Sequence, residues 1–535
     1  MKITWRRLAT LTLALLMVLS CFAFVGCKDP VDPVDPVDPV DPVDPVDPVD
    51  PVDPVDPVDP VDPVDPVDPV DPVDPEDPEE PEEPEEPRED YLVTLPQTNY
   101  GNQTYTFLTS DDTWRQKDLY IASEDDAAGS TLDEAIFYRN LRVEEYLGVD
   151  FDCMTSTLNW GTWSKGEYKN VIRTSYEAGD QDFQLAESYF NGFTELAMEG
   201  LAADLRSIET IDLSAPWYAQ AFVNGSTING QTYGIVGDIA MTFWDNIFCL
   251  YFNKDVGARY EINDVLYDLA DNGEFTLEFM MNCAEMHSAE NGNDTWDMED
   301  TYGIAYNQHT LRMATINYGI NQTTYNEDTE EYDLTFYDEH TENVFATMKG
   351  YLESNYATMT GQDGEFNVAA DMFMENRLLF MPAIFKTSQD LRRMTGEFGI
   401  LPMPKFNEDQ EAYRGLVKDD GNSFIVPSHA EDPEFCAEVA HALGAESKYS
   451  VVPVYYDVIL KGRTTKDDES KVMLDIVRES IYTDFGQMHG IVHIPTFAGN
   501  MQNEDVEAYK PIWDEASLSY ETRLRTVLDY YWMVR

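Results

Sequence analysis

Basic side chains are scarce in this chain. Its 535 residues carry 34 lysines and arginines against 102 aspartates and glutamates, which gives a formal net charge of −68. So negative a chain repels phosphate backbones and anionic lipid surfaces. Nucleic-acid binding and electrostatic docking on a membrane are therefore excluded as functions, and a neutral or cationic partner is favoured.

Cysteine and glycine-rich loops are also in short supply. Four of the six cysteines lie beyond the N-terminal region, and they are Cys153, Cys249, Cys283 and Cys436. None stands in a CxxC pattern, so a zinc site has no support. One disulfide is compatible with an exported protein, but the spacing does not identify it. No glycine-rich phosphate loop follows a predicted strand, so we expect no nucleotide and no other cofactor.

The N-terminus has the features of an export signal. Lys2, Arg6 and Arg7 precede an apolar run, Leu8 to Leu19, that is too short for a comfortable membrane span. The following Phe24-Val25-Gly26-Cys27 resembles the lipobox of bacterial lipoproteins. We therefore expect residues 1–26 to be a lipoprotein signal peptide and Cys27 to carry the lipid that anchors the protein. A generic signal peptide with incidental cysteines is the alternative.

A proline repeat follows the cysteine. Asp-Pro-Val triplets run from Asp29 to Pro75, and Glu-Glu-Pro repeats continue to Pro87. Proline at every third position forbids helix and sheet and favours polyproline II, and the like charges add extension. Residues 27–90 are thus predicted to be a stiff tether without packed structure that holds the rest of the chain away from a membrane. Neutral repeat expansion in a tolerated linker is the alternative.

The remaining residues, 91–535, carry a core-forming pattern that alternates strands and helices. Residues 105–112 alternate like a strand. Residues 131–148 have helical periodicity, with Thr131 and Glu134 as a capping box and Gly148 as the stop. Strand-like and helical segments then repeat at 149–154, 182–190 and 193–205. This order predicts an α/β fold with largely parallel sheets.

Six separated segments resemble, in the same order, the family-1 extracellular solute-binding proteins, which are the capture subunits of ABC importers. The segments are 229–256, 274–286, 300–307, 375–385, 398–406 and 419–443. The first ends in Phe252-Asn253-Lys254, similar to the family's recurrent YNK, whereas Thr276-Leu277 lacks the family's tryptophan. Residues 454–477 are similar to a subgroup of clostridial lipoproteins. The resemblance covers roughly residues 100–490.

This resemblance implies a two-lobed periplasmic-binding-protein-like fold of type II, with a hinge and a central ligand cleft. The first lobe would hold about 100–240 and 398–450 and the second about 245–395, while the C-terminal helices 451–535 would pack on the second lobe and hinge. The implied protein is a monomer on the extracellular face of a bacterial, Gram-positive cell membrane. It is no enzyme: it captures a carbohydrate, expected to be an oligosaccharide, and delivers it to ABC permease subunits.

A sugar site needs aromatic platforms and side chains that bond hydroxyl groups. Trp244 and Asp245 lie where the chain is expected to cross between lobes, so they are the first candidates, the indole for stacking and the carboxylate for hydroxyls. Packing of the hinge is the alternative role for Trp244. Glu187, Tyr189 and Asn191 end a predicted strand, with loop packing as the alternative, and Asp419, Asp420 and Asn422 precede a strand at the second crossover. Phe385 resembles a position where sugar-binding members of the family often have a stacking aromatic. Tyr455, Tyr456 and Asp457 follow Pro453, with hinge packing as the alternative, and Trp217 follows Pro216 as a platform or a surface anchor.

Two other possibilities are weaker. One is a glycan-binding or glycoside-active surface lipoprotein that is not coupled to transport, but among 76 acidic residues in 91–535 no pair has a local catalytic signature. The other is calcium at the oxygen-rich segment 291–300, which lacks the EF-hand spacing and its terminal glutamate. A solvated loop is favoured there. His309 has no second histidine nearby, so no metal site is expected.

Overall fold

The computed structural model describes residues 89–360, 366–460, 468–495, 497 and 506–533. All of them belong to one structural unit, Glu83–Arg535. The expected signal peptide, the lipidation site Cys27 and nearly all of the tether lie outside the described residues and stay predictions. Among the described helices, none combines the length and apolar character that a membrane span needs.

The first lobe is built on a four-stranded sheet with the order β11-β3-β1-β2. Its strands are β1 (Gln103–Ser110), β2 (Val149–Ser156), β3 (Leu185–Tyr189) and β11 (Asn422–Ile425). β1 is parallel to both β2 and β3, and β11 runs antiparallel to β3. The strands predicted at 105–112 and 149–154 are thereby confirmed. The carboxyl ends of three parallel strands meet at one edge of this sheet, which is where α/β folds hold their ligands.

Short helices cover this sheet. They are α2 (Thr113–Gln116), α3 (Glu124–Ala127), α4 (Thr131–Leu147), α5 (Trp160–Ser164), α6 (Glu167–Ala178), α7 (Gly192–Met198), α8 (Gln220–Ser226) and α17 (Pro433–Glu446), with 3-10 turns η1 (Leu92–Thr94) and η2 (Leu205–Ser207). The predicted helix α4 ends at Gly148 in the left-handed region, as expected. Its cap lies one residue earlier than predicted, because the Ser130 side chain accepts from the Asp133 amide.

The second lobe is built on a five-stranded sheet with the order β10-β4-β9-β5-β8. The strands are β4 (Phe248–Asn253), β5 (Tyr302–Tyr306), β8 (Ala357–Met359), β9 (Leu378–Ile384) and β10 (Phe398–Leu401). β4 is antiparallel to β9 and β10, whereas β5 is parallel to β8 and β9. The first sheet is therefore largely parallel, as expected, with β11 as an antiparallel edge strand, whereas the second sheet is mixed.

The boundary expected at residue 398 differs from the structure. β10 was assigned to the first lobe because 398–406 resembles a return crossover, but its four residues are all buried and pair with β4 in the second sheet. A buried apolar run of four residues favours a strand. This strand pairs with β4 along the edge that β9 does not occupy. The chain returns to the first lobe further on, where Val417 pairs with Ile247 of the other crossover.

Helices and a hairpin complete the second lobe. They are α10 (Lys254–Arg259), α11 (Asn263–Asp271), α12 (Leu277–His287), α13 (Gln308–Asn317), α14 (Glu339–Leu352), α15 (Phe366–Met374), α16 (Thr387–Leu391), and the β6 (Thr323–Asn326) and β7 (Glu331–Leu334) pair. α12 approaches β5 so closely that a Cβ atom on Gly303 would lie 2.1 Å from the Ala284 Cα. Only glycine fits there.

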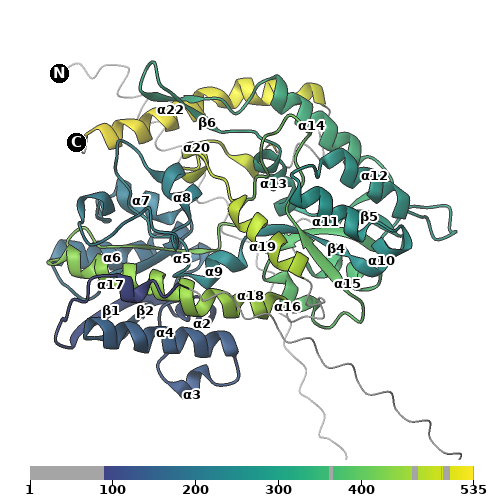
Figure 1. Ribbon diagram of the computed structural model, residues 1–535. Helices are drawn as coiled ribbons and strands as arrows, with labels where there is room; N and C mark the ends of the chain where they lie inside the picture. The colour runs from purple at the N-terminus through teal and green to yellow at the C-terminus, as the bar shows by residue number, and fades with distance from the viewer. Residues whose placement is uncertain (1–88, 361–365, 461–467, 496, 498–505, 534–535) are drawn as a thin grey trace, which may run out of the picture. The chain divides into compact units, whose positions relative to one another are not determined.

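The C-terminal segments contact both lobes. They are the π-helical η3 (Ser447–Val451), α18 (Val452–Leu460), α19 (Asp468–Glu479), α20 (Phe485–Met488), η4 (Val506–Ala508) and α22 (Tyr509–Met533), which is yellow in Figure 1. α18 packs against α4 of the first lobe and α16 of the second, and α19 packs against β10 and α11. The C-terminal helices were expected to pack on the second lobe and the hinge, and the structure adds a contact between α18 and the first lobe.

Candidate functional site

A cavity of about 630 Å³ lies where the two lobes meet the crossover. The first lobe lines it with α2 and the start of α4, the crossover contributes the short helix α9 (Met241–Asp245), and α16 and α18 close the remaining side. Its volume falls in the range of 300–1,000 Å³ that small-molecule sites usually have. This inter-lobe cavity is the candidate binding site.

Trp114 brings an indole to the cavity. It lies directly after β1, and its position is fixed because the Asp112 carboxylate accepts from the Trp114 amide at 3.0 Å and thereby starts α2. The indole Nε1 donates to Asp245 Oδ2 at 3.1 Å. The Lys386 ammonium, just before α16, lies 3.6 Å from the centroid of the same ring. Trp114 therefore joins the first lobe, the crossover and the start of α16.

Asp245 anchors the floor of the cavity. Its other oxygen, Oδ1, accepts from the Tyr455 hydroxyl of α18 at 2.9 Å. Burial raises the pKa of Asp245, while hydrogen bonds from Tyr455 and Trp114 and the charge of Lys386 act in the opposite direction. Each carboxylate oxygen keeps a second lone pair, so Asp245 can still accept from a ligand hydroxyl.

The rest of the lining mixes charged, amide and hydroxyl groups. Lys117 and Asp133 form an ion pair at the wall, and Gln389 and Arg392 project from the second-lobe side. Met241, Leu132, Ile136 and Val458 supply apolar surface. An indole, apolar contacts and convergent hydrogen-bonding groups together suit a polyhydroxylated ring.

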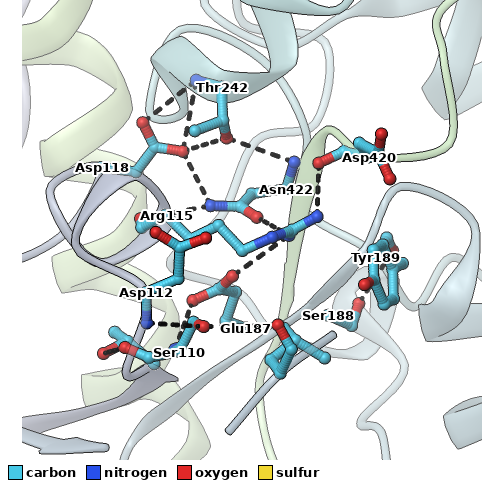
Figure 2. A network of polar contacts seen from close by, with 12 residues as sticks. Ser110, Asp112, Arg115, Asp118, Glu187, Ser188, Tyr189, Thr242, Asp420 and Asn422 are labelled. Atoms are coloured by element: carbon cyan, nitrogen blue, oxygen red, sulfur yellow. Dashed lines mark hydrogen bonds and ion pairs between the residues drawn. The ribbon is translucent and has the colours of Figure 1, made fainter. Parts of the chain in front are cut away.

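Behind the cavity, Arg115 is the centre of a buried polar network (Figure 2). Its Nη1 lies 3.3 Å from Glu187 Oε1 of β3 and also donates to Asn422 Oδ1 of β11. Its Nη2 donates to the Asp420 carbonyl at 2.6 Å, and its guanidinium lies 4.5 Å over the Tyr189 ring. Burial raises the pKa of Glu187, against the charge of Arg115. Arg115 thus ties the ends of β1, β3 and β11 together.

The same network reaches the crossover helix. Asn422 Nδ2 donates to Asp118 Oδ2 at 2.8 Å, and the Thr242 amide of α9 donates to Asp118 Oδ1 at 3.1 Å. Figure 2 shows Asp118 beside these two partners, with dashed lines to both. Burial raises the pKa of Asp118 to about 7, although these hydrogen bonds lower it. The edge of the first sheet therefore holds α9, and with it Asp245, in place.

Trp244, the first candidate from the sequence, lies in packed surroundings and does not line the cavity. It is 5% exposed, its ring meets the Phe243 ring edge at a centroid distance of 4.9 Å, and the Arg478 guanidinium covers it at 4.1 Å. Arg478 of α19 also donates to Asp238 at 2.9 Å. Trp244 is thus placed as the alternative role of hinge packing requires, while its neighbour Asp245 reaches the cavity.

The other predicted residues fall into two groups. Those near the cavity or its supporting network are Glu187, Tyr189, Asp420, Asn422 and Tyr455. Asn191 stands at the start of α7, two residues after Tyr189. The structure does not bring the remaining ones to the lining. Phe385 is fully buried, and Trp217 packs between Tyr91 and His441 in the first lobe. Tyr456 bonds to Asp475, and Asp419 and Asp457 are exposed.

Sequence reasoning missed Trp114, Arg115, Asp118 and Lys386. The first three directly follow β1, which was predicted as a strand, so the rule applied to residues 187–191 at the end of β3 would have found them. Lys386 has no signal in the sequence, because its role depends on the Trp114 ring brought from the other lobe.

The oxygen-rich segment 291–300 is a loop that bonds to itself. The Asp300 carboxylate accepts from the amides of Asn291 at 2.8 Å and Asp297 at 2.6 Å. Within the described ranges, no three His, Cys, Asp or Glu side chains converge as a metal site would require. Cys153, Cys249, Cys283 and Cys436 form no disulfide with one another.

Comparison with known proteins identifies the fold. No protein-family model matches the chain, and no curated protein matches it. Solved structures do. An extracellular solute-binding protein from Staphylococcus aureus in complex with maltose is 10% identical, with 79% of this chain and 98% of that chain covered and a TM-score of 0.52. The sugar-binding protein MalE from Xanthomonas citri is 11% identical, with coverage of 81% and 99% and a TM-score of 0.52. The chain therefore has the two-lobed periplasmic-binding-protein fold, as predicted.

Proposed function

We propose that this protein is the extracellular substrate-binding protein of an ABC importer, which captures a carbohydrate between its lobes and delivers it to a permease. The observation that carries the proposal is the inter-lobe cavity, in which Trp114 and Asp245 meet beside hydrogen-bonding side chains from both lobes. That two proteins of the same fold are a maltose complex and a sugar-binding protein supports a carbohydrate as the solute.

The chemistry of capture is non-covalent. Trp114 belongs to the first lobe and Lys386 lies beside the second, so their contact breaks when the lobes separate and forms again when they close. A ligand that binds between them favours the closed form by its differential affinity for the two states. The closed form is then what the permease recognises. Capture of this kind needs no nucleophile and no general acid.

We expect Trp114→Ala to weaken binding of the sugar by about 2 kcal/mol, or roughly 30-fold, because the stacking surface is lost. A screen of a glycan panel with the wild-type protein identifies the ligand, and titration calorimetry with that glycan measures the loss. Trp296→Ala is the matched control, since Trp296 is also half-buried but packs on Tyr302, away from the cavity. Full affinity in Trp114→Ala would remove this residue from the site.

The proposal includes a lipid anchor at Cys27, based on the lipobox-like Phe24–Cys27. Acyl chains contribute about 0.8 kcal/mol for each buried CH₂ group, so several chains hold a protein firmly at the membrane. Cys27→Ala is expected to release the protein from the membrane fraction of expressing cells. Persistence of the mature variant in that fraction would show that another anchor operates.

A further inference from the structure

Trp160 is an exposed tryptophan at the edge of the first sheet where ligands are expected. It follows the carboxyl end of β2 and begins α5, yet 67% of its surface is exposed. A capping box fixes this position: Asn159 accepts from the Thr162 amide at 3.0 Å, and the Thr162 hydroxyl accepts from the Asn159 amide at 3.0 Å. A large ring is thus held in water by an ordered backbone.

The surroundings of Trp160 are rigid. Its ring meets Tyr189, the last residue of β3, edge-on at a centroid distance of 6.1 Å, and buried Trp163 meets the same tyrosine at 5.8 Å. The loop before α5 is tied to the end of β1, because the Thr157 hydroxyl donates to Asp111 at 2.6 Å. These contacts already restrict the neighbouring side chains, so stacking of a ligand ring on Trp160 costs little additional side-chain entropy.

A row of planar groups, of which Arg115 and Tyr189 are buried, connects Trp160 to the cavity. The Arg115 guanidinium lies 5.8 Å from the Trp114 ring and 4.5 Å from the Tyr189 ring, and Tyr189 contacts Trp160. Trp114 lines the cavity, so the row runs from the cavity along the carboxyl ends of β1, β3 and β2 to the exposed indole.

Groups that bond hydroxyls stand beside this row. Asn191 follows Tyr189 by two residues, and its side-chain amide does not cap α7 and has no hydrogen bond to the described part of the chain. Burial is the main cause of the raised pKa of Tyr189, and the charge of the exposed Asp112 is close enough to add to it. An amide can donate to and accept from sugar hydroxyls, and a carboxylate can accept from them.

We propose that Trp160, with Asn191, forms an outer subsite that stacks a second ring of an oligosaccharide whose first ring lies in the inter-lobe cavity. This inference rests on the proposed function and adds a residue that determines the length of the preferred ligand. The outer subsite strengthens binding of chains long enough to reach it and contributes nothing to a single ring held against Trp114.

The test is titration calorimetry of full-length protein with a length series, from monosaccharide to tetrasaccharide, of the glycan selected by the panel. Wild-type affinity is expected to rise with length. Trp160→Ala should lose about tenfold with the longest member and less than about twofold with the shortest. Trp160→Phe should recover most of the loss, because it keeps an aromatic face. Leu518→Ala, which removes a side chain 71% exposed on α22, is the control and should leave every affinity unchanged.

Three results would overturn the proposal, and they are distinguishable. If the wild type binds the series and Trp160→Ala binds every length equally well, the outer subsite does not exist and Trp160 faces another partner, such as the permease, while the proposed function stands. If the wild type binds no glycan in the panel, the proposed function fails and the outer subsite fails with it. A uniform loss at all lengths in Trp160→Ala would also contradict an outer position.

Discussion

Arg115→Met is expected to lower the free energy of unfolding by about 3–5 kcal/mol, the cost of leaving a buried charge without its partner. The side chains of Arg115 and Glu187 are 5% and 1% exposed, so water does not replace the guanidinium. Asn422 and the Asp420 carbonyl lose a donor at the same time. Chemical denaturation of the ligand-free protein measures the effect.

The loss should depend on pH. Burial already raises the pKa of Glu187, and removing Arg115 takes away the charge that opposes this rise. A carboxyl group with a raised pKa in the folded state contributes stability at low pH, and that contribution disappears as the pH rises through the folded pKa. The deficit of Arg115→Met is therefore expected to be larger at pH 8 than at pH 5.

Two comparisons separate this effect from general damage. Arg393→Met breaks an ion pair with Asp371 whose side chains are 64% and 59% exposed, and it should cost less than about 1 kcal/mol. Replacing Glu187 by methionine as well as Arg115 removes the uncompensated charge and should restore part of the stability. Equal losses at the buried and the exposed pair would show that the network in Figure 2 does not hold the sheet edge.

Trp244→Ala is expected to destabilise the ligand-free protein by about 3–5 kcal/mol, as truncation of a buried aromatic side chain usually does. The substitution leaves a cavity beside Phe243 and removes the surface on which Arg478 rests. Arg478 also neutralises Asp238, which is 1% exposed, so a displaced guanidinium would weaken a buried ion pair as well.

Melting and titration of the same variant decide between packing and binding. Packing predicts a melting temperature several degrees below that of the wild type, with affinity for the glycan changed only indirectly. Trp160→Ala should melt like the wild type, since its ring is largely exposed. An unchanged melting temperature with lost affinity would instead show that Trp244 is the stacking platform that the sequence suggested.

The sequence predicted the elements whose patterns are local. β1, β2 and α4 follow from alternation, 3.6-residue periodicity and the Gly148 stop, and the two-lobed fold follows from the resemblance. β10 was misplaced because its pairing with β4 brings together residues about 150 positions apart, and no local pattern reports such a contact. Phe385 was a candidate because of the family resemblance and Trp217 because it follows Pro216, but the burial of both depends on neighbours from distant segments.

The candidate site, like the fold, could be predicted from the sequence only where the signal is local. The sequence located the crossover at Trp244 and Asp245, but it did not reveal that these residues end a helical turn, α9. Successive side chains in a helix point about 100° apart. Only Asp245 therefore reaches the cavity, and Trp244 turns toward Arg478. The indole that lines the cavity is that of Trp114, which lies in α2 of the first lobe.

The most direct test of the central claim, capture of a carbohydrate without turnover, is a thermal-shift screen of the full-length protein against a glycan panel, with the glycans analysed afterwards. A glycan at 100 times its dissociation constant stabilises the folded state by about 2.7 kcal/mol. We predict that at least one glycan raises the melting temperature of the wild type, shifts Trp114→Ala much less, and is recovered intact. No shift with any glycan, or cleavage of the glycan that binds, would contradict the claim.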